Sequence, residues 1–137
     1  MRKNLLLALA LSALTACTTV TTSINVVPYP NEVEIKGGTF TAAGADFNYS
    51  PEFDQPAKDA INAFAQQLSL TSGKESRTSE GTAGKGFVFR YNAALPAEAY
   101  SLSVSRKAAV AEASSLNGVI YAIQTIKQML PDRKSVV

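Results

Sequence analysis

Two segments of the chain place apolar residues three or four positions apart, which predicts two helices with one apolar face each. They cover residues 55–70 and 115–130, with Asp54 suited to cap the first and Pro131 suited to end the second. The apolar positions are Ala57, Ile61, Phe64, Ala65 and Leu68 in the first, and Val119, Ile123, Ile126 and Leu130 in the second. Two such helices cannot shield both faces from water by themselves, so the rest of the chain must provide a sheet that covers them.

Short β-branched and aromatic runs are predicted to form that sheet. The expected strands are residues 24–27, 33–35, 39–41, 47–49 and 87–91, followed by a hairpin with arms at 100–105 and 108–113. Residues 71–86 contain four Gly, three Thr and three Ser without periodicity, and they are expected to form a surface loop. The predicted fold class is α+β, with a mixed, mainly antiparallel sheet and two helices packed on one face.

The N-terminus has the pattern of an export signal. Arg2 and Lys3 precede an apolar run at residues 5–14, which is about half the length needed to span a bilayer as a helix. The run ends in Leu-Thr-Ala-Cys, which resembles the bacterial lipobox, so Cys17 is the predicted lipidation site. The alternative is an ordinary secretory signal with a Cys nearby.

These patterns divide the chain into a lipoprotein signal peptide at 1–16, a lipidated Cys and tether at 17–23, a folded domain at 24–131 and a tail at 132–137. Lipid on Cys17 would attach the protein to a membrane without any protein segment crossing it. The expected location is the cell envelope of a Gram-negative bacterium. The outer membrane facing the periplasm is favoured, because no acidic cluster follows Cys17 to mark transfer to the cell surface.

Charge and residue counts exclude several function classes. The 13 Lys and Arg include two in the signal segment, so 11 remain against 11 Asp and Glu, and nucleic acid is not an expected partner. The chain contains no His and a single Cys, which excludes His-ligated metal sites, Ser-His-Asp triads, Cys-His pairs and internal disulfides. We expect no cofactor and no metal.

The carboxylates do not form a convincing acid and base pair. Glu32 and Glu34 share a strand face near Asn31 and Lys36, and nothing apolar is positioned to raise one pKa and leave the other low, as such a pair requires. Asp54 and Asp59 fit a helix cap and a first-turn acid better. Glu98 and Glu112 stand alone. We therefore assign no catalytic residue.

Three further patterns have simpler structural explanations. Asn48-Tyr49-Ser50 is a glycosylation sequon, which a bacterial host would leave unused. Tyr29, Phe87, Phe89 and Tyr91 could make a platform for sugar stacking, although strand spacing favours core positions for them. The Gly-rich residues 81–86 lack the spacing of a phosphate-binding loop and are expected to be a linker.

Three longer stretches resemble a known family. They are VVPYP at 26–30 followed by GTF at 38–40, EAYSLSV at 98–104, and ASSLNG at 113–118 running into YAIQTIKQML at 121–130. Together they resemble the N-terminal ancillary domain of bacterial β-N-acetylhexosaminidases, glycoside hydrolase family 20. The resemblance covers residues 24–131.

This resemblance implies a parent enzyme that removes terminal N-acetylhexosamine from glycans. In the family, a β/α barrel carries an Asp-Glu pair that acts with the acetamido group of the substrate. That barrel is the expected partner of this domain. Its His-containing motif cannot lie in a chain without His, so residues 132–137 are a tail or the start of the missing barrel and the chain alone is expected to be inactive.

Two alternatives remain open from the sequence. The first is a non-enzymatic lipoprotein that binds a glycan or a protein. The second is the equivalent ancillary domain of another glycoside hydrolase, such as an O-GlcNAc hydrolase or an α-glucuronidase.

Overall fold

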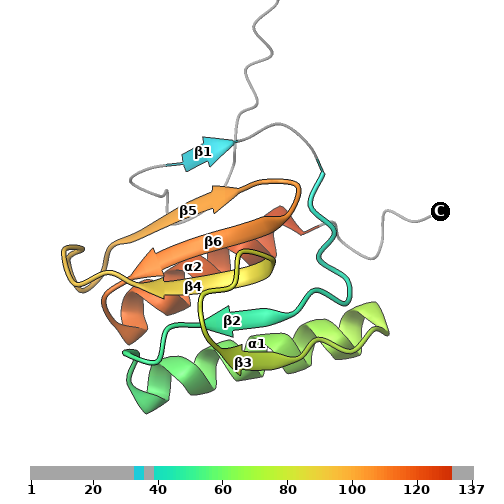
Figure 1. Ribbon diagram of the computed structural model, residues 1–137, viewed down its shortest axis with the longest axis horizontal. Coiled ribbons are helices and arrows are strands. Elements are labelled where there is room, and N and C mark those ends of the chain that lie inside the picture. The colour runs from blue at the N-terminus through green and yellow to red at the C-terminus, as the bar shows by residue number, and fades with distance from the viewer. Residues whose placement is uncertain (1–32, 36–38, 131–137) are drawn as a thin grey trace, which may run out of the picture.

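A computed structural model describes residues 33–35 and 39–130, in which a six-stranded sheet carries two helices (Figure 1). This arrangement confirms the predicted α+β class with a mixed sheet. The export signal, Cys17, the tether, the predicted strand at 24–27 and the tail lie outside the described residues.

The strands run in the spatial order β1-β5-β6-β4-β2-β3. Their bounds are Val33–Ile35 for β1, Phe47–Tyr49 for β2, Thr78–Glu80 for β3, Gly86–Tyr91 for β4, Tyr100–Val104 for β5 and Ala108–Ala113 for β6. Only β5 and β6 pair antiparallel, as the predicted hairpin. The other four neighbouring pairs are parallel, so the expectation of a mainly antiparallel sheet was wrong.

The parallel pairing follows from how the strands are connected. Parallel neighbours need a crossover connection, and the helix α1, Gln55–Ser72, provides one between β2 and both β3 and β4. Strands that are adjacent in sequence pair with each other in the β5–β6 hairpin and in the parallel pair β2–β3, which α1 connects.

Two local predictions also differ from the structure. Thr39–Thr41 is not a strand, and the expected loop at 71–86 contains the edge strand β3. All three residues of β3 are exposed, and backbone pairing with β2 holds the strand in the sheet. Because no β3 side chain is buried, the sequence has no apolar alternation there to reveal a strand.

Both helices begin and end with recognisable caps. The Asp54 carboxylate accepts a hydrogen bond of 3.0 Å from the Ala57 N–H, as predicted for the start of α1. The helix runs two residues beyond the expected end and stops at Gly73, which has a left-handed φ of 72°. The second helix, α2, spans Leu116–Met129 and has Ser115 as its N-cap.

The core lies between the sheet and the helix layer. α2 lies against β5 and β6, α1 lies against β2, and the two helices contact each other. Phe47 stacks on Phe87 with ring centroids 4.6 Å apart, and Phe64 of α1 meets the Phe47 ring edge-on at 5.2 Å. All the apolar helix positions predicted from spacing are buried except Leu130, which is partly buried.

Candidate functional site

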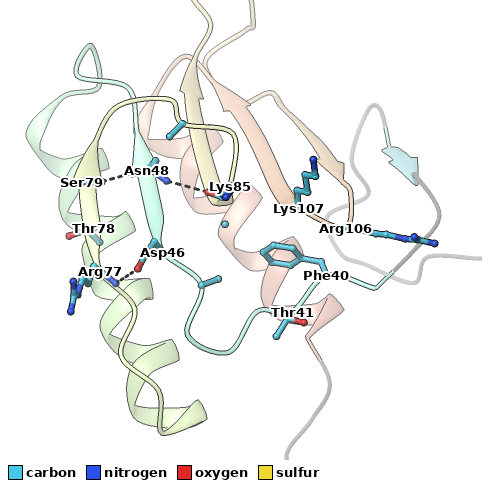
Figure 2. Close-up of a pocket in the computed structure, with 13 residues that line it drawn as sticks. Phe40, Thr41, Asp46, Asn48, Arg77, Thr78, Ser79, Lys85, Arg106 and Lys107 are labelled. Carbon is cyan, nitrogen blue, oxygen red and sulfur yellow. Dashed lines mark hydrogen bonds between the residues drawn. The ribbon is translucent and has the colours of Figure 1, made fainter.

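A hollow of about 610 Å³ lies at the edge of the sheet where four parallel strands begin (Figure 2). We call it the basic groove. It is lined by Phe40, Thr41, Ala45, Asp46, Asn48, Arg77, Thr78, Ser79, Ala83, Lys85, Gly86, Arg106 and Lys107. No residue of α1 or α2 lines it, so the groove belongs to the strand ends and their connections.

The charges of the basic groove gather because of the parallel pairing. Asp46, Arg77, Lys85 and Lys107 stand immediately before β2, β3, β4 and β6. Parallel strands begin at the same edge of a sheet, so residues distant in sequence become neighbours there. Arg106 joins them from the β5–β6 turn.

Hydrogen bonds hold the wall of the basic groove in place. The Asn48 side-chain amide donates to the Lys85 carbonyl at 3.2 Å and accepts from the Ser79 hydroxyl at 2.8 Å. The Asp46 carboxylate accepts from the Arg77 N–H at 3.2 Å, and the Gly86 N–H donates to the Lys107 carbonyl at 3.0 Å. The backbone around the groove is therefore fixed by bonds between strand ends.

The basic groove has an excess of positive charge. Four cations line it, and all four are exposed: Arg77, Lys85, Arg106 and Lys107. Asp46 is the single carboxylate among the lining residues. This set of groups can attract an anion, but it contains no pair of carboxylates for acid and base catalysis.

Sequence reasoning did not identify this cluster. Lys85 lies in the segment expected to be a linker, Arg77 lies within the expected loop, and residues 106–107 lie between the two expected hairpin arms. A cation directly before each of three strands is the signal in the sequence. That signal has meaning only once the strands are known to be parallel.

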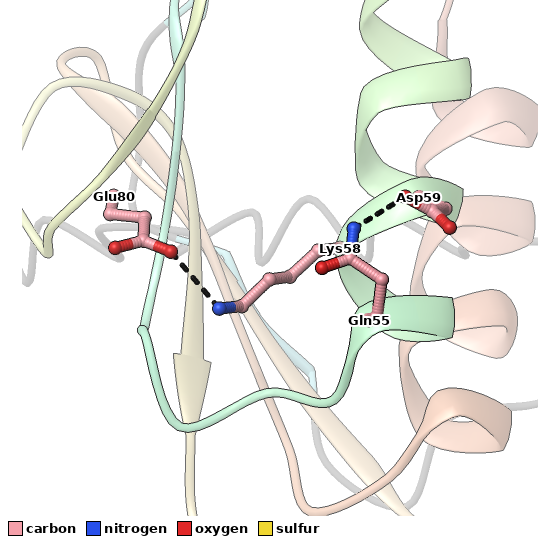
Figure 3. A network of polar contacts seen from close by, with 4 residues as sticks. All are labelled: Gln55, Lys58, Asp59 and Glu80. Carbon is pink, nitrogen blue, oxygen red and sulfur yellow. Dashed lines mark hydrogen bonds and ion pairs between the residues drawn. The ribbon is translucent and has the colours of Figure 1, made fainter.

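The candidate acids Asp54 and Asp59 have structural roles near the start of α1, and Figure 3 shows the contact of Asp59. Asp54 caps the helix, and Asp59 accepts a hydrogen bond of 2.8 Å from the Gln55 side chain. Lys58, next to them, forms an ion pair of 3.0 Å with Glu80 of β3. The predicted cap is confirmed, whereas the expectation of Asp59 as a first-turn acid was wrong, because Asp59 lies beyond the first turn of α1. The Lys58–Glu80 ion pair connects the helix to the edge strand.

The remaining carboxylates are not brought together. Glu34 lies on β1 opposite Ser103 of β5, while Glu32 lies outside the described residues. Glu98 is exposed, and Glu112 accepts a hydrogen bond of 3.1 Å from the Asn92 side chain. The structure therefore adds no acid and base pair in the described part of the chain.

The aromatic residues considered for sugar stacking do not form a platform. Phe87 and Phe89 are each 1% exposed and belong to the core. Tyr91 packs edge-on against Phe53, and Tyr29 lies outside the described residues. The amide of the sequon residue Asn48 already bonds to Ser79 and Lys85 in the groove wall.

A second, apolar hollow of about 520 Å³ adjoins the first and shares Phe40 and Thr41 with it. Its walls come from residues 39–43, the sheet and the end of α2. Among the described residues, no group of three or more His, Cys, Asp and Glu is placed to hold a metal ion. Neither described helix has the length and hydropathy needed to cross a bilayer.

These features define a two-layer α+β domain with one carboxylate, Asp46, among the residues that line its two hollows. The chain belongs to glycosyl hydrolase family 20, because residues 23–137 match domain 2 of that family. No curated protein matches the chain.

Two solved structures are similar to this domain. A GH20 exo-β-N-acetylglucosaminidase from Vibrio harveyi, crystallised as an inactive mutant, is 26% identical with a TM-score of 0.61. The same enzyme in complex with N-acetylglucosamine is 26% identical with a TM-score of 0.60. These matches cover 80% and 79% of the present chain but only 17% and 16% of the solved chains.

Proposed function

We propose that this chain is the ancillary domain of a β-N-acetylhexosaminidase that hydrolyses terminal N-acetylhexosamine from glycans, with the catalytic barrel as its partner in the same protein. The family 20 domain 2 match over residues 23–137 carries the proposal. The Vibrio harveyi enzymes support it, since most of each solved chain lies outside the part that this domain matches.

The composition of the exposed helix face is consistent with contact with a large partner. An exposed helix face normally carries charged residues, whereas the centre of an interface is depleted of them. Residues 60–72 of α1 contain no charged residue, and Lys127 is the one charged residue of α2. The exposed positions there are Ala63, Gln66, Gln67, Leu70 and Thr71 of α1, and Asn117, Gln124, Lys127, Gln128 and Met129 of α2.

This helix face is suited to contact with the barrel. Leu70 is 82% exposed and Met129 is 38% exposed, so each helix has one large apolar side chain that is open to solvent.

We expect no glycosidase activity from the 137-residue chain alone. The basic groove has one carboxylate, and hydrolysis by this chemistry requires a proton donor and a second group that supports attack at the anomeric carbon. The purified chain, assayed on a chromogenic N-acetylglucosaminide, should match a buffer control. Turnover that disappears on mutating Asp46 would show that the active site lies in this domain.

The downstream reading frame provides the complementary control. Co-expression of the domain with the barrel encoded after it should yield turnover that the domain alone lacks. A reading frame without a barrel would favour the alternative of a glycan- or protein-binding lipoprotein without an enzymatic part.

The proposed location is the outer membrane of a Gram-negative bacterium, with the domain facing the periplasm. The support is the lipobox pattern that ends at Cys17. Stable attachment to the membrane would need two or three acyl chains on Cys17, because a single chain gives only reversible membrane binding.

Lipidation of Cys17 is directly testable. We expect a clickable fatty acid to label the wild-type chain in cells and the Cys17→Ala variant to lose that label, because the chain has no other cysteine. Labelling is measured on the immunoprecipitated protein. Equal labelling of both proteins would mean that the segment is an ordinary secretory signal or that the lipid is attached elsewhere.

A further inference from the structure

We propose that the basic groove binds an anionic glycan, a chain of sugars that carries carboxylate, sulfate or phosphate groups at intervals. The choice of a glycan rests on the proposed function, while the anion preference rests on the groove itself. It would give this domain a glycan contact of its own, separate from the hydrolytic site proposed for the barrel.

The cations form a row. Lys107, Lys85 and Arg77 precede β6, β4 and β3, with Asp46 before β2 between the last two. Three strand spacings of about 4.8 Å separate β6 from β3, so Lys107 and Arg77 start from backbone positions about 14 Å apart. Figure 2 shows Arg77 at one end and Arg106 at the other, pointing in opposite directions, with Lys85 and Lys107 between them. A row of this kind fits an extended polyanion better than a single phosphate.

The positive charge is not cancelled within the groove. Asp46 is the one acid among the lining residues, so a single negative charge stands against four positive ones. Phe40 adds an aromatic wall beside the cations, which suits a ligand with apolar faces between its charged groups. The groove therefore combines charge complementarity for anions with a surface for sugar rings.

The shape and composition of the groove distinguish a glycan from other polyanions. A flat bilayer contacts protruding side chains, whereas these cations line a hollow of about 610 Å³. Single-stranded nucleic acid binds through several stacking aromatic rings, and Phe40 is the one aromatic residue among those lining the groove. Since α1 and α2 contribute nothing to the groove, a barrel packed on the helix layer would leave it accessible.

The test is binding of the 137-residue chain to heparin, a sulfated polysaccharide, at about 50 mM salt. The variants are Lys85→Gln with Lys107→Gln, and Lys127→Gln on α2 as a control that removes a charge away from the groove. An exposed charge contact contributes about threefold in affinity, so we expect about a tenfold loss for the double variant. The control should stay within about twofold, and higher salt should weaken wild-type binding.

Other results would overturn the proposal. These are absence of heparin binding, a double variant that binds like wild type, and equal losses in the double variant and the control. Tighter groove-dependent binding to single-stranded DNA or to phosphatidylglycerol vesicles would assign the groove to a nucleic acid or to a membrane instead. If the double variant failed to fold, Arg106→Gln would replace it, with about a threefold expected loss. Heparin binding requires no hydrolysis, so its failure is independent of a missing barrel.

Discussion

Truncation of a buried isoleucine in α2 is expected to remove much of the stability of the domain. Ile123 and Ile126 are 7% and 4% exposed and face the sheet from the centre of the helix. Replacing either with Ala should lower the free energy of unfolding by about 2–5 kcal/mol, because the change removes buried apolar surface and leaves a cavity. Domains of this size have about 5–15 kcal/mol in total, so urea unfolding should show a large shift of the midpoint.

Gln124→Ala is the matched control, because this residue lies in the same helix turn and is exposed. Its expected effect on the free energy of unfolding is within about 0.5 kcal/mol. If Gln124→Ala destabilised the domain more than Ile126→Ala, the assignment of the buried helix face would be wrong. The packing of both helices on one face of the sheet would then also be wrong.

Gly86→Ala is expected to have a comparably large effect, through the backbone rather than through apolar burial. Gly86 begins β4 with a φ of +74°, a left-handed conformation that side chains disfavour. A Cβ atom at this position would lie 2.2 Å from the Asp46 carbonyl oxygen. The starts of β2 and β4 would therefore have to move apart. Strain and displacement together should cost about 2–5 kcal/mol in urea unfolding.

Gly84→Ala, two residues earlier, is the control for this substitution. A Cβ atom on Gly84 meets nothing within 4 Å, and the residue does not have a left-handed φ. We expect a change within about 0.5 kcal/mol, or slight stabilisation from a less flexible unfolded chain. Equal stability of the Gly86→Ala and Gly84→Ala variants would contradict the close approach of β4 to Asp46.

The features that could be predicted from the sequence are those set by residues close together in the chain. The steps of four and three residues between Val119, Ile123 and Ile126 identify the buried face of α2, and Asp54 marks the start of α1. The alternation in β4 places Phe87 and Phe89 on one face, and both are core residues. The strand β3 was missed because its pairing uses backbone atoms and buries no side chain.

The family was also recognisable from the sequence, since the closing-helix residues that carried the resemblance lie within the matched range 23–137. The candidate site, in contrast, was not recognisable from the sequence. Arg77, Lys85 and Lys107 are separated by up to 30 positions, and no local pattern relates them.

Local spacing in the sequence determined which segments are helices and strands and which of their faces are apolar, because that information resides in neighbouring residues. The order and direction of the strands depend on how distant segments pair, and the crossover through α1 makes β2, β3 and β4 parallel. Only this tertiary arrangement places the starts of four strands at one edge and turns scattered charges into the basic groove. The physical reason is that backbone pairing between strands is similar for all residues, so side chains alone do not specify which strands become neighbours.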